Sequence, residues 1–163
     1  MKTLFLAWQA PNPTRAWYPI GRLDAEPEQP YYRFRYTGGA LTAERDAGLC
    51  PLYAFPDFKA DYESPELFPL FKNRVLSPRR PDFDEYLQML ALDRQHAGEM
   101  DILSVSGGER VTDNLEVFPR IRKREDGGFT VRFFLHGQRH LPAASTERSL
   151  VLQPGDRLRI MVE

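Results

Sequence analysis

The chain has 163 residues, of which 42% are hydrophobic and 12% aromatic, so it can bury the core of one domain or of two small ones. Charged residues make up 28%, the formal net charge is −1, and no apolar run approaches the roughly 18 residues that a membrane-spanning helix needs. We therefore expect a soluble protein. Because Gln9, Pro11 and Pro13 interrupt the apolar N-terminus, we expect a first strand rather than a signal peptide, and a cytoplasmic protein without a membrane partner.

Charge and proline are distributed unevenly along the chain. Residues 1–109 carry 12 Lys and Arg against 16 Asp and Glu, whereas residues 110–163 carry 10 against 7. Eleven of the 14 prolines lie before residue 82. Since proline favours turns and interrupts regular elements, this distribution predicts a compact, turn-rich first part and a more regular, β-rich second part.

The first part begins with strands. Residues 3–9 and 17–23 are rich in aromatic and branched side chains and are separated by the turn-forming sequence PNPTRA. A further strand is expected over residues 31–37, and the sequence GGALTAERDAG over residues 38–48 predicts a short helix with glycine at both ends.

Aromatic and arginine residues alternate in the strand YYRFRYT. Tyr32, Phe34 and Tyr36 fall on one face, and Arg33 and Arg35 fall on the other. Such an alternation can serve as a nucleic-acid platform, in which bases stack on rings and arginines bind phosphates. We favour an ordinary amphipathic strand, because aromatic residues are common in the buried faces of sheets.

Two helices are predicted within residues 64–90. In the first, Ser64 is the expected N-cap and Pro65 the first helical position, followed at helical spacing by Leu67, Leu70, Phe71, Arg74 and Val75. The sequence SPRRPD ends this helix. In the second, Asp82 is the expected N-cap, and the apolar stripe consists of Phe83, Tyr86, Leu87 and Leu90. This pattern predicts a helical pair that packs on a sheet.

A double glycine follows a third, short apolar helix in the sequence GEMDILSVSGG. Gly107 and Gly108 come after that helix rather than before one, and neither GxxxxGK[ST] nor GxGxxG occurs. We therefore predict a helix C-cap rather than a phosphate-binding loop, with an extended exit through LEVFP.

The residues that usually carry catalysis or metal binding are sparse. Cys50 is the single cysteine, which excludes an intrachain disulfide and a thiolate zinc cluster, and we expect its thiol to be buried. His136 and His140 have the spacing of a helical zinc pair, but their surroundings are strand-like and contain glycine, and His96 lies far away in sequence. We predict no catalytic residues, no metal, no cofactor and no enzymatic activity, although a base close to Cys50 in space stays open.

Four motifs follow one another in the order of a known family. They are Ile20-Gly21-Arg22-Leu23, Phe34-Arg35-Tyr36, Pro51-Leu52-Tyr53-Ala54-Phe55-Pro56 and Leu67-Phe68-Pro69-Leu70-Phe71-Lys72-Asn73. Together with the Gly-Gly turn, they resemble the small N-terminal subdomain of HipA-type serine/threonine kinases over about residues 17–118. Ser77-Pro78 departs from the family's Leu-Pro-Glu, which suggests a diverged standalone or fused copy.

The resemblance implies a protein partner. In the HipA family this subdomain sits against the kinase core, and in split systems a separate small chain pairs with the kinase and restrains it. The ATP-binding lobe and catalytic aspartate of the kinase belong to a longer domain that this sequence lacks. By this analogy the chain binds a HipA-like kinase or another protein, and the expected contact residues are Leu67, Phe68, Leu70, Phe71 and Asn73.

A second resemblance covers about residues 128–163. The sequences VRFFLHG at 131–137 and LQPGDRLRIMVE at 152–163 resemble the first half of a HIRAN domain, a small β-barrel associated with binding DNA, notably single-stranded ends. Because the sequence stops at Glu163, the expected barrel is incomplete. The basic residues also suit phosphate neutralisation, although such clusters are usually solvated surface. The expected DNA-binding residues are Arg122, Lys123, Arg124, Arg132, Phe133, Phe134 and Arg159.

The sequence thus predicts an α+β fold in two parts. Residues 1–118 are expected to form a small antiparallel β-sheet packed with short helices, and residues 119–163 an incomplete HIRAN-like β-barrel segment. The favoured function is a non-catalytic regulatory module of a bacterial toxin–antitoxin-like system that binds a HipA-type kinase. The alternative is a HIRAN-type module that binds single-stranded DNA or DNA ends. A third interpretation, in which the apolar stripe only fills the chain's own core, also stays open.

Overall fold

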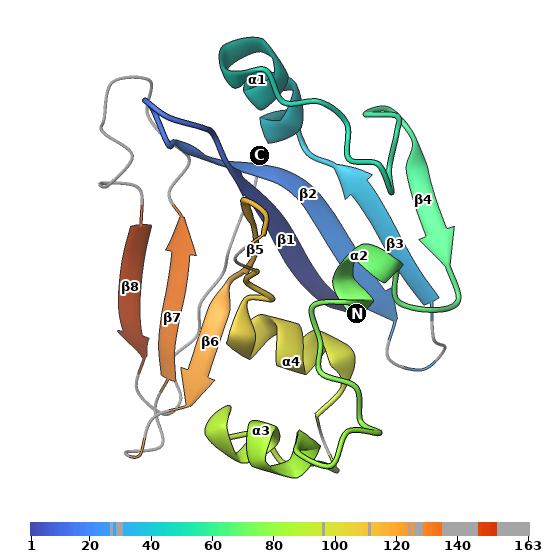
Figure 1. Cartoon of the computed structure of the whole chain (residues 1–163), viewed down its shortest axis with the longest axis vertical. Coiled ribbons are helices and arrows are strands. Elements are labelled where there is room, and N and C mark those ends of the chain that lie inside the picture. Colours follow the sequence, from blue (N-terminus) through green and yellow to red (C-terminus); the bar gives the residue numbers. More distant parts are fainter. Residues whose placement is uncertain are drawn as a thin grey trace.

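The computed structural model describes residues 1–26, 28, 31–95, 97–110, 112–123, 125, 129–134 and 147–152, with the backbone alone at 121–123, 129–134, 147–150 and 152 (Figure 1). In chain order the elements are β1 (Lys2–Gln9), β2 (Trp17–Glu26), β3 (Tyr31–Tyr36), α1 (Gly38–Ala47), β4 (Asp61–Ser64), α2 (Pro69–Lys72), α3 (Phe83–Met89), α4 (Glu99–Ser106), β5 (Leu115–Phe118), β6 (Arg120–Lys123), β7 (Phe129–Phe134) and β8 (Glu147–Leu152).

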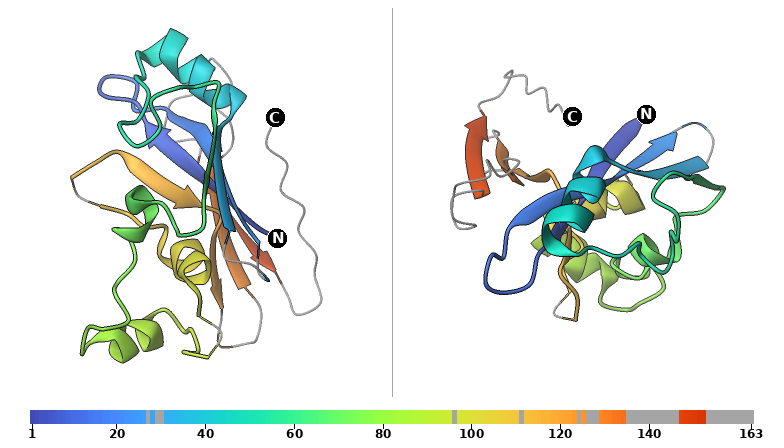
Figure 2. Two further views of the ribbon diagram at one scale, coloured as in Figure 1. Left: turned by 90° about the vertical axis from the view of Figure 1, so that its right-hand side faces the viewer. Right: turned by 90° about the horizontal axis from the view of Figure 1, so that it is seen from above.

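The first five strands form one antiparallel sheet in the order β4-β3-β2-β1-β5. Helices α1, α2, α3 and α4 lie on the same side of this sheet (Figure 2). The main core lies between the two layers, where Leu6, Ile20 and Phe34 are fully buried beside Leu103 of α4. The predicted α+β class, an antiparallel sheet packed with short helices, is confirmed.

Strand β3 has the amphipathic pattern that its sequence predicts. Phe34 is fully buried and Tyr32 and Tyr36 are half-buried against the core, whereas Arg33 and Arg35 are exposed on the other face. The rings and the guanidinium groups therefore lie on opposite sides of the sheet, and β3 is not a surface on which bases stack while arginines bind phosphates.

The structure corrects the expected start of the helix after Ser64. Residues 61–64 form the edge strand β4, which pairs with β3 through Tyr32 and Ser64 at one end, and helix α2 begins only at Pro69. Pairing with β3 supplies the backbone of this segment with hydrogen-bond partners that a helix start at Pro65 would not use. The predicted second helix agrees better, because α3 has Asp82 as its N-cap residue.

Cys50 is also a correction, since its side chain is exposed rather than buried. It follows Leu49, which is 5% exposed and closes the end of α1. The chain leaves the core at this point, so the thiol faces solvent.

Helix α4 ends at the double glycine, as predicted. Gly107 is the C-cap residue, and the backbone of both glycines is left-handed, with φ of 72° and 57°. Helix α3 packs against α4 through a small cluster of Phe83, Leu87 and Ile102. The predicted helical pair is thus only partly correct, because α2 packs on the sheet through Phe71, whereas α3 packs on α4.

A second, three-stranded antiparallel sheet has the order β6-β7-β8 and lies beside β5 in Figure 1. The change from one sheet to the other falls at Pro119, between Phe118 of β5 and Arg120 of β6. The HIRAN-like barrel stays a prediction. Within the residues that the structure describes, no helix is long and apolar enough to cross a membrane.

Candidate interaction surface

The segment Leu67–Asn73, predicted to bind a partner, is fixed to the core by two side chains four residues apart. Leu67 is 3% exposed and Phe71 is fully buried. Phe68 and Leu70 are half-buried at the edge of the same core, and Asn73 is exposed at the end of α2. Leu67 and Phe71 are therefore part of the chain's own core. Phe68, Leu70 and Asn73 remain accessible, so another molecule can contact them.

Arg74 follows this segment and anchors its end by hydrogen bonds. Its side chain is charged but only 1% exposed. Its Nε donates to the carbonyl oxygen of Leu70 at 3.0 Å, and its Nη1 donates to that of Gly108 at 2.9 Å. The guanidinium also forms an ion pair with Asp113 and donates to the Leu115 carbonyl at 3.4 Å. A buried guanidinium is tolerated when its donors are satisfied in this way. Arg74 thereby joins the end of α2 to the double-glycine turn and to β5.

Gly107 lies against a second buried arginine. A Cβ atom at Gly107 would lie 2.1 Å from Nε of Arg120, which donates through Nη2 to the carbonyl oxygen of Ser106. Arg120 Nε also lies 3.1 Å from Oε1 of Glu116 in an ion pair. Because Arg120 is the first residue of β6, it connects the second sheet to the end of α4. No sequence motif pointed to either arginine as a buried connector.

An aromatic cluster links the segment to the loop between α1 and β4. The ring of Phe55 stacks on that of Phe34, with centroids 3.9 Å apart, and meets the ring of Phe68 edge-on at 5.1 Å. Phe55 is 1% exposed. The loop between α1 and β4 contains neither helix nor strand, but the buried ring of Phe55 anchors it to the core. The loop and the segment Leu67–Asn73 are therefore neighbours in space.

A tight turn at Leu52–Phe55 is closed by hydrogen bonds. The Phe55 N–H donates to the Leu52 carbonyl at 2.8 Å, and the Leu52 N–H donates to the Tyr36 hydroxyl at 2.7 Å. That hydroxyl donates in turn to the Phe55 carbonyl at 2.8 Å. Tyr36 thus ties both ends of the turn to β3. Burial raises the pKa of Tyr36 to about 12.

This pKa predicts a loss of stability in alkali. The folded chain holds the Tyr36 proton up to about pH 12, whereas an unfolded tyrosine releases it near its ordinary pKa of 10.0. The stabilisation is therefore complete below pH 10 and is lost as the pH rises toward 12. We expect the free energy of unfolding, measured in urea, to fall more between pH 9 and pH 11 for the wild type than for Tyr36→Phe. Equal losses in the two proteins would contradict this prediction.

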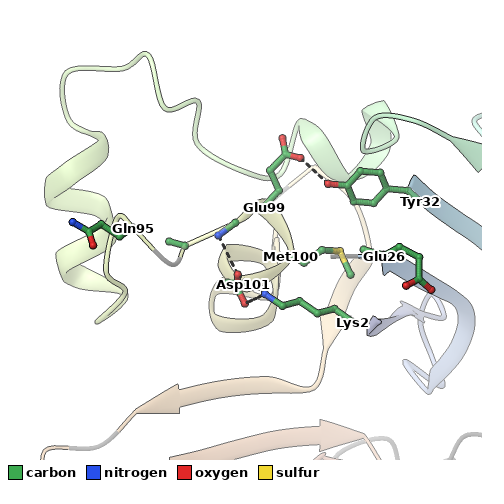
Figure 3. A pocket seen from close by; sticks show the side chains of 10 residues that line it. Lys2, Glu26, Tyr32, Gln95, Glu99, Met100 and Asp101 are labelled. Atoms are coloured by element: carbon green, nitrogen blue, oxygen red, sulfur yellow. Dashed lines mark hydrogen bonds and ion pairs between the residues drawn. The ribbon is translucent and has the colours of Figure 1, made fainter. Parts of the chain in front are cut away.

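A hollow of about 470 Å³ lies at the other end of β3, between β1, β2 and the start of α4 (Figure 3). Lys2 Nζ lies 2.6 Å from Oδ1 of Asp101, whose Oδ2 accepts the Gly98 N–H at 3.0 Å. The Tyr32 hydroxyl donates to Glu99 at 3.4 Å, and burial followed by the Glu99 charge raises the pKa of Tyr32. These polar groups pair with one another and stabilise the start of α4.

Among the described residues no group of three or more His, Cys, Asp or Glu could hold a metal ion.

The predicted DNA-binding residues lie in the second part. Arg122 and Lys123 belong to β6, and Arg132, Phe133 and Phe134 belong to β7, where the backbone register places Arg132 opposite Arg120. The side chains of these five residues lie outside the described part of the structure, as do Arg124 and Arg159 and the pair His136 and His140. Their role in DNA binding stays a prediction.

Comparisons of the chain with protein-family models, with curated proteins and with solved structures give no match.

Proposed function

We propose that this chain is a non-catalytic regulatory module of a bacterial toxin–antitoxin-like system, which binds a HipA-type serine/threonine kinase in the cytoplasm. The order of the motifs supports the kinase as the partner. The structural support is that the segment Leu67–Asn73 is fixed to the fold. Leu67 and Phe71 are buried in the core, and the buried Arg74 forms an ion pair at the end of the segment. A fixed segment loses little conformational entropy when a partner binds it.

The accessible residues of the segment would contact the partner. Phe68 and Leu70 offer apolar surface and Asn73 offers an exposed amide, while Leu67 and Phe71 act as their support. An interface centred on such residues gains most of its free energy from apolar burial. By occupying the kinase through this surface and the neighbouring loops, the chain would restrain it.

Purification of the tagged chain from its own host tests this function. Mass spectrometry identifies bound proteins, and nuclease-sensitive absorbance reports nucleic acid. We expect recovery of a HipA-like kinase, strongly reduced by Asn73→Arg and unchanged by Gln88→Arg, a matched substitution at an exposed position of α3. The proposal fails if the kinase is not recovered, or if both variants recover it as well as the wild type does.

The second candidate function is binding of single-stranded DNA by the β6-β7-β8 sheet. Its support is that five of the predicted DNA-binding residues fall on two paired strands, β6 and β7. If phosphate contacts dominate, affinity for a single-stranded oligonucleotide should fall steeply between about 50 and 200 mM salt. Arg132→Ala and Arg159→Ala should each weaken binding and reduce this salt dependence. Unchanged affinity in both variants would exclude the proposed role of these arginines.

A further inference from the structure

The turn that follows the segment Leu67–Asn73 has the sequence Ser77-Pro78-Arg79-Arg80, and the proposed contact does not use it. Ser77 is the only exposed serine among the residues whose side chains the structure describes, since the other serines there are half-buried. Pro78 and both arginines are exposed as well. The turn therefore presents a hydroxyl group to solvent with two positive charges close to it in the chain.

Hydrogen bonds order the backbone of this turn. The Arg80 N–H donates to the Ser77 carbonyl oxygen at 3.0 Å, and Pro78 takes the position of the turn that proline favours. The Arg79 N–H donates to the Ser77 Oγ at 3.3 Å. The Arg80 guanidinium pairs with Asp82 at 2.9 Å, but the two side chains are 57% and 47% exposed. Such an exposed pair contributes little stability, so a stronger anion can displace Asp82.

A phosphate group on Ser77 would be such an anion. It carries a charge of about −1.5 to −2 at neutral pH and three strong acceptor oxygens. The Arg79 N–H, which now donates to the Ser77 Oγ, can donate to one of these oxygens. The guanidinium groups of Arg79 and Arg80, two and three residues away, can bind the others in the bidentate manner typical of arginine and phosphate. The turn thus has the donors that a phosphoserine needs.

We propose that Ser77 is a phosphoacceptor for the HipA-type kinase that this chain binds, and that Arg79 and Arg80 bind the resulting phosphate. This inference rests on the proposed function and adds a regulatory step to it. Ser77 lies four residues after Asn73, and four residues span at most about 14 Å. A kinase that contacts the segment Leu67–Asn73 therefore has this hydroxyl close to its own surface.

The transfer needs a nucleoside triphosphate, which the kinase supplies. The Ser77 Oγ forms a bond to the γ-phosphorus of ATP, the bond between that phosphorus and the oxygen it shares with the β-phosphate breaks, and ADP leaves. The hydroxyl proton passes to the catalytic aspartate of the kinase. The chain itself contributes only the acceptor and the two arginines.

The first test incubates the full chain with the purified HipA-like kinase encoded beside it, Mg²⁺ and ATP, and mass spectrometry locates the added phosphate. Thr14 is the matched control, because it is an exposed hydroxyl beside the exposed Arg15 on the loop between β1 and β2. We expect phosphate on Ser77 and none on Thr14, and no phosphorylation of Ser77→Ala. Asn73→Arg should slow phosphorylation of Ser77 at least tenfold because it weakens docking. The Kd for the kinase, measured without ATP, should change less than twofold in Ser77→Ala.

A second measurement tests the two arginines without the kinase. Phosphoserine is incorporated at position 77 of the full chain, and phosphorus NMR follows the pKa of its phosphate, which is ordinarily about 6. We expect a pKa below that value, and a higher pKa when Arg79→Ala and Arg80→Ala are combined. Lys59→Ala removes an exposed cation from the loop between α1 and β4 and should leave this pKa unchanged.

The outcomes separate this inference from the proposed function. Binding of the kinase with phosphate on Ser77 supports both. Binding without phosphorylation of Ser77, or with Thr14 phosphorylated as fast, keeps the proposed function and overturns the phosphoacceptor. An equal phosphate pKa with and without the two arginines overturns their role. Neither binding nor phosphorylation overturns the proposed function together with the inference.

Discussion

Replacing Arg74 with alanine is expected to lower the free energy of unfolding by about 3–5 kcal/mol, because each buried carbonyl oxygen that loses its donor costs about 1–3 kcal/mol. The substitution removes the buried donors to the carbonyl oxygens of Leu70, Gly108 and Leu115 and leaves the Asp113 carboxylate without its partner. Small domains are stabilised by only about 5–15 kcal/mol, so the variant should unfold at a much lower urea concentration.

Two further variants make this prediction specific to the geometry of the guanidinium. Arg74→Lys keeps the charge but cannot reach several acceptors at once, so most of the loss should remain. Arg79→Ala removes an exposed arginine five residues away and should change the stability by less than about 0.5 kcal/mol. If Arg74→Ala is no less stable than Arg79→Ala, the buried connection is not a determinant of the fold.

Replacing Phe55 with alanine is expected to cost about 3–5 kcal/mol, the usual loss for a buried phenylalanine. Its ring is 1% exposed and packs against Phe34, Tyr62 and Phe68, so its removal leaves a cavity in the core. Urea unfolding followed by circular dichroism measures the loss. Tyr53→Ala, two residues earlier in the same turn, should leave the stability within about 0.5 kcal/mol of the wild type. If Phe55→Ala is as stable as Tyr53→Ala, the burial of Phe55 does not anchor the turn to the core.

Elements with a strong local pattern could be predicted from the sequence. Strand β3 follows from the alternation of Tyr32, Phe34 and Tyr36 with two arginines, and the end of α4 follows from Gly107. The helix start at Ser64 was wrong because a local capping pattern competes with pairing between β4 and β3, and that pairing depends on residues about 30 positions away. Tertiary contacts override local propensity at such a boundary.

The buried arginines and the exposure of Tyr53 could not be predicted in this way. Arg74 occurs in an apolar stripe at helical spacing, but its acceptors Gly108, Asp113 and Leu115 lie 34 to 41 residues further along the chain. Nothing local indicates that Phe55 is buried while Tyr53, two residues before it, is fully exposed. The same holds for Cys50, for which composition favoured burial and the course of the chain gives exposure. Long-range contacts decide each of these positions.

The most direct test of the proposed function is the Kd between the purified chain and a HipA-like kinase encoded beside it, measured at about 50 and 200 mM salt and compared with the Kd for a single-stranded oligonucleotide. An apolar interface around Phe68 and Leu70 predicts tight binding to the kinase that changes little with salt, whereas phosphate-driven binding weakens steeply. No binding to the kinase, together with salt-dependent binding to the oligonucleotide, would contradict the kinase proposal and place the function in the second sheet.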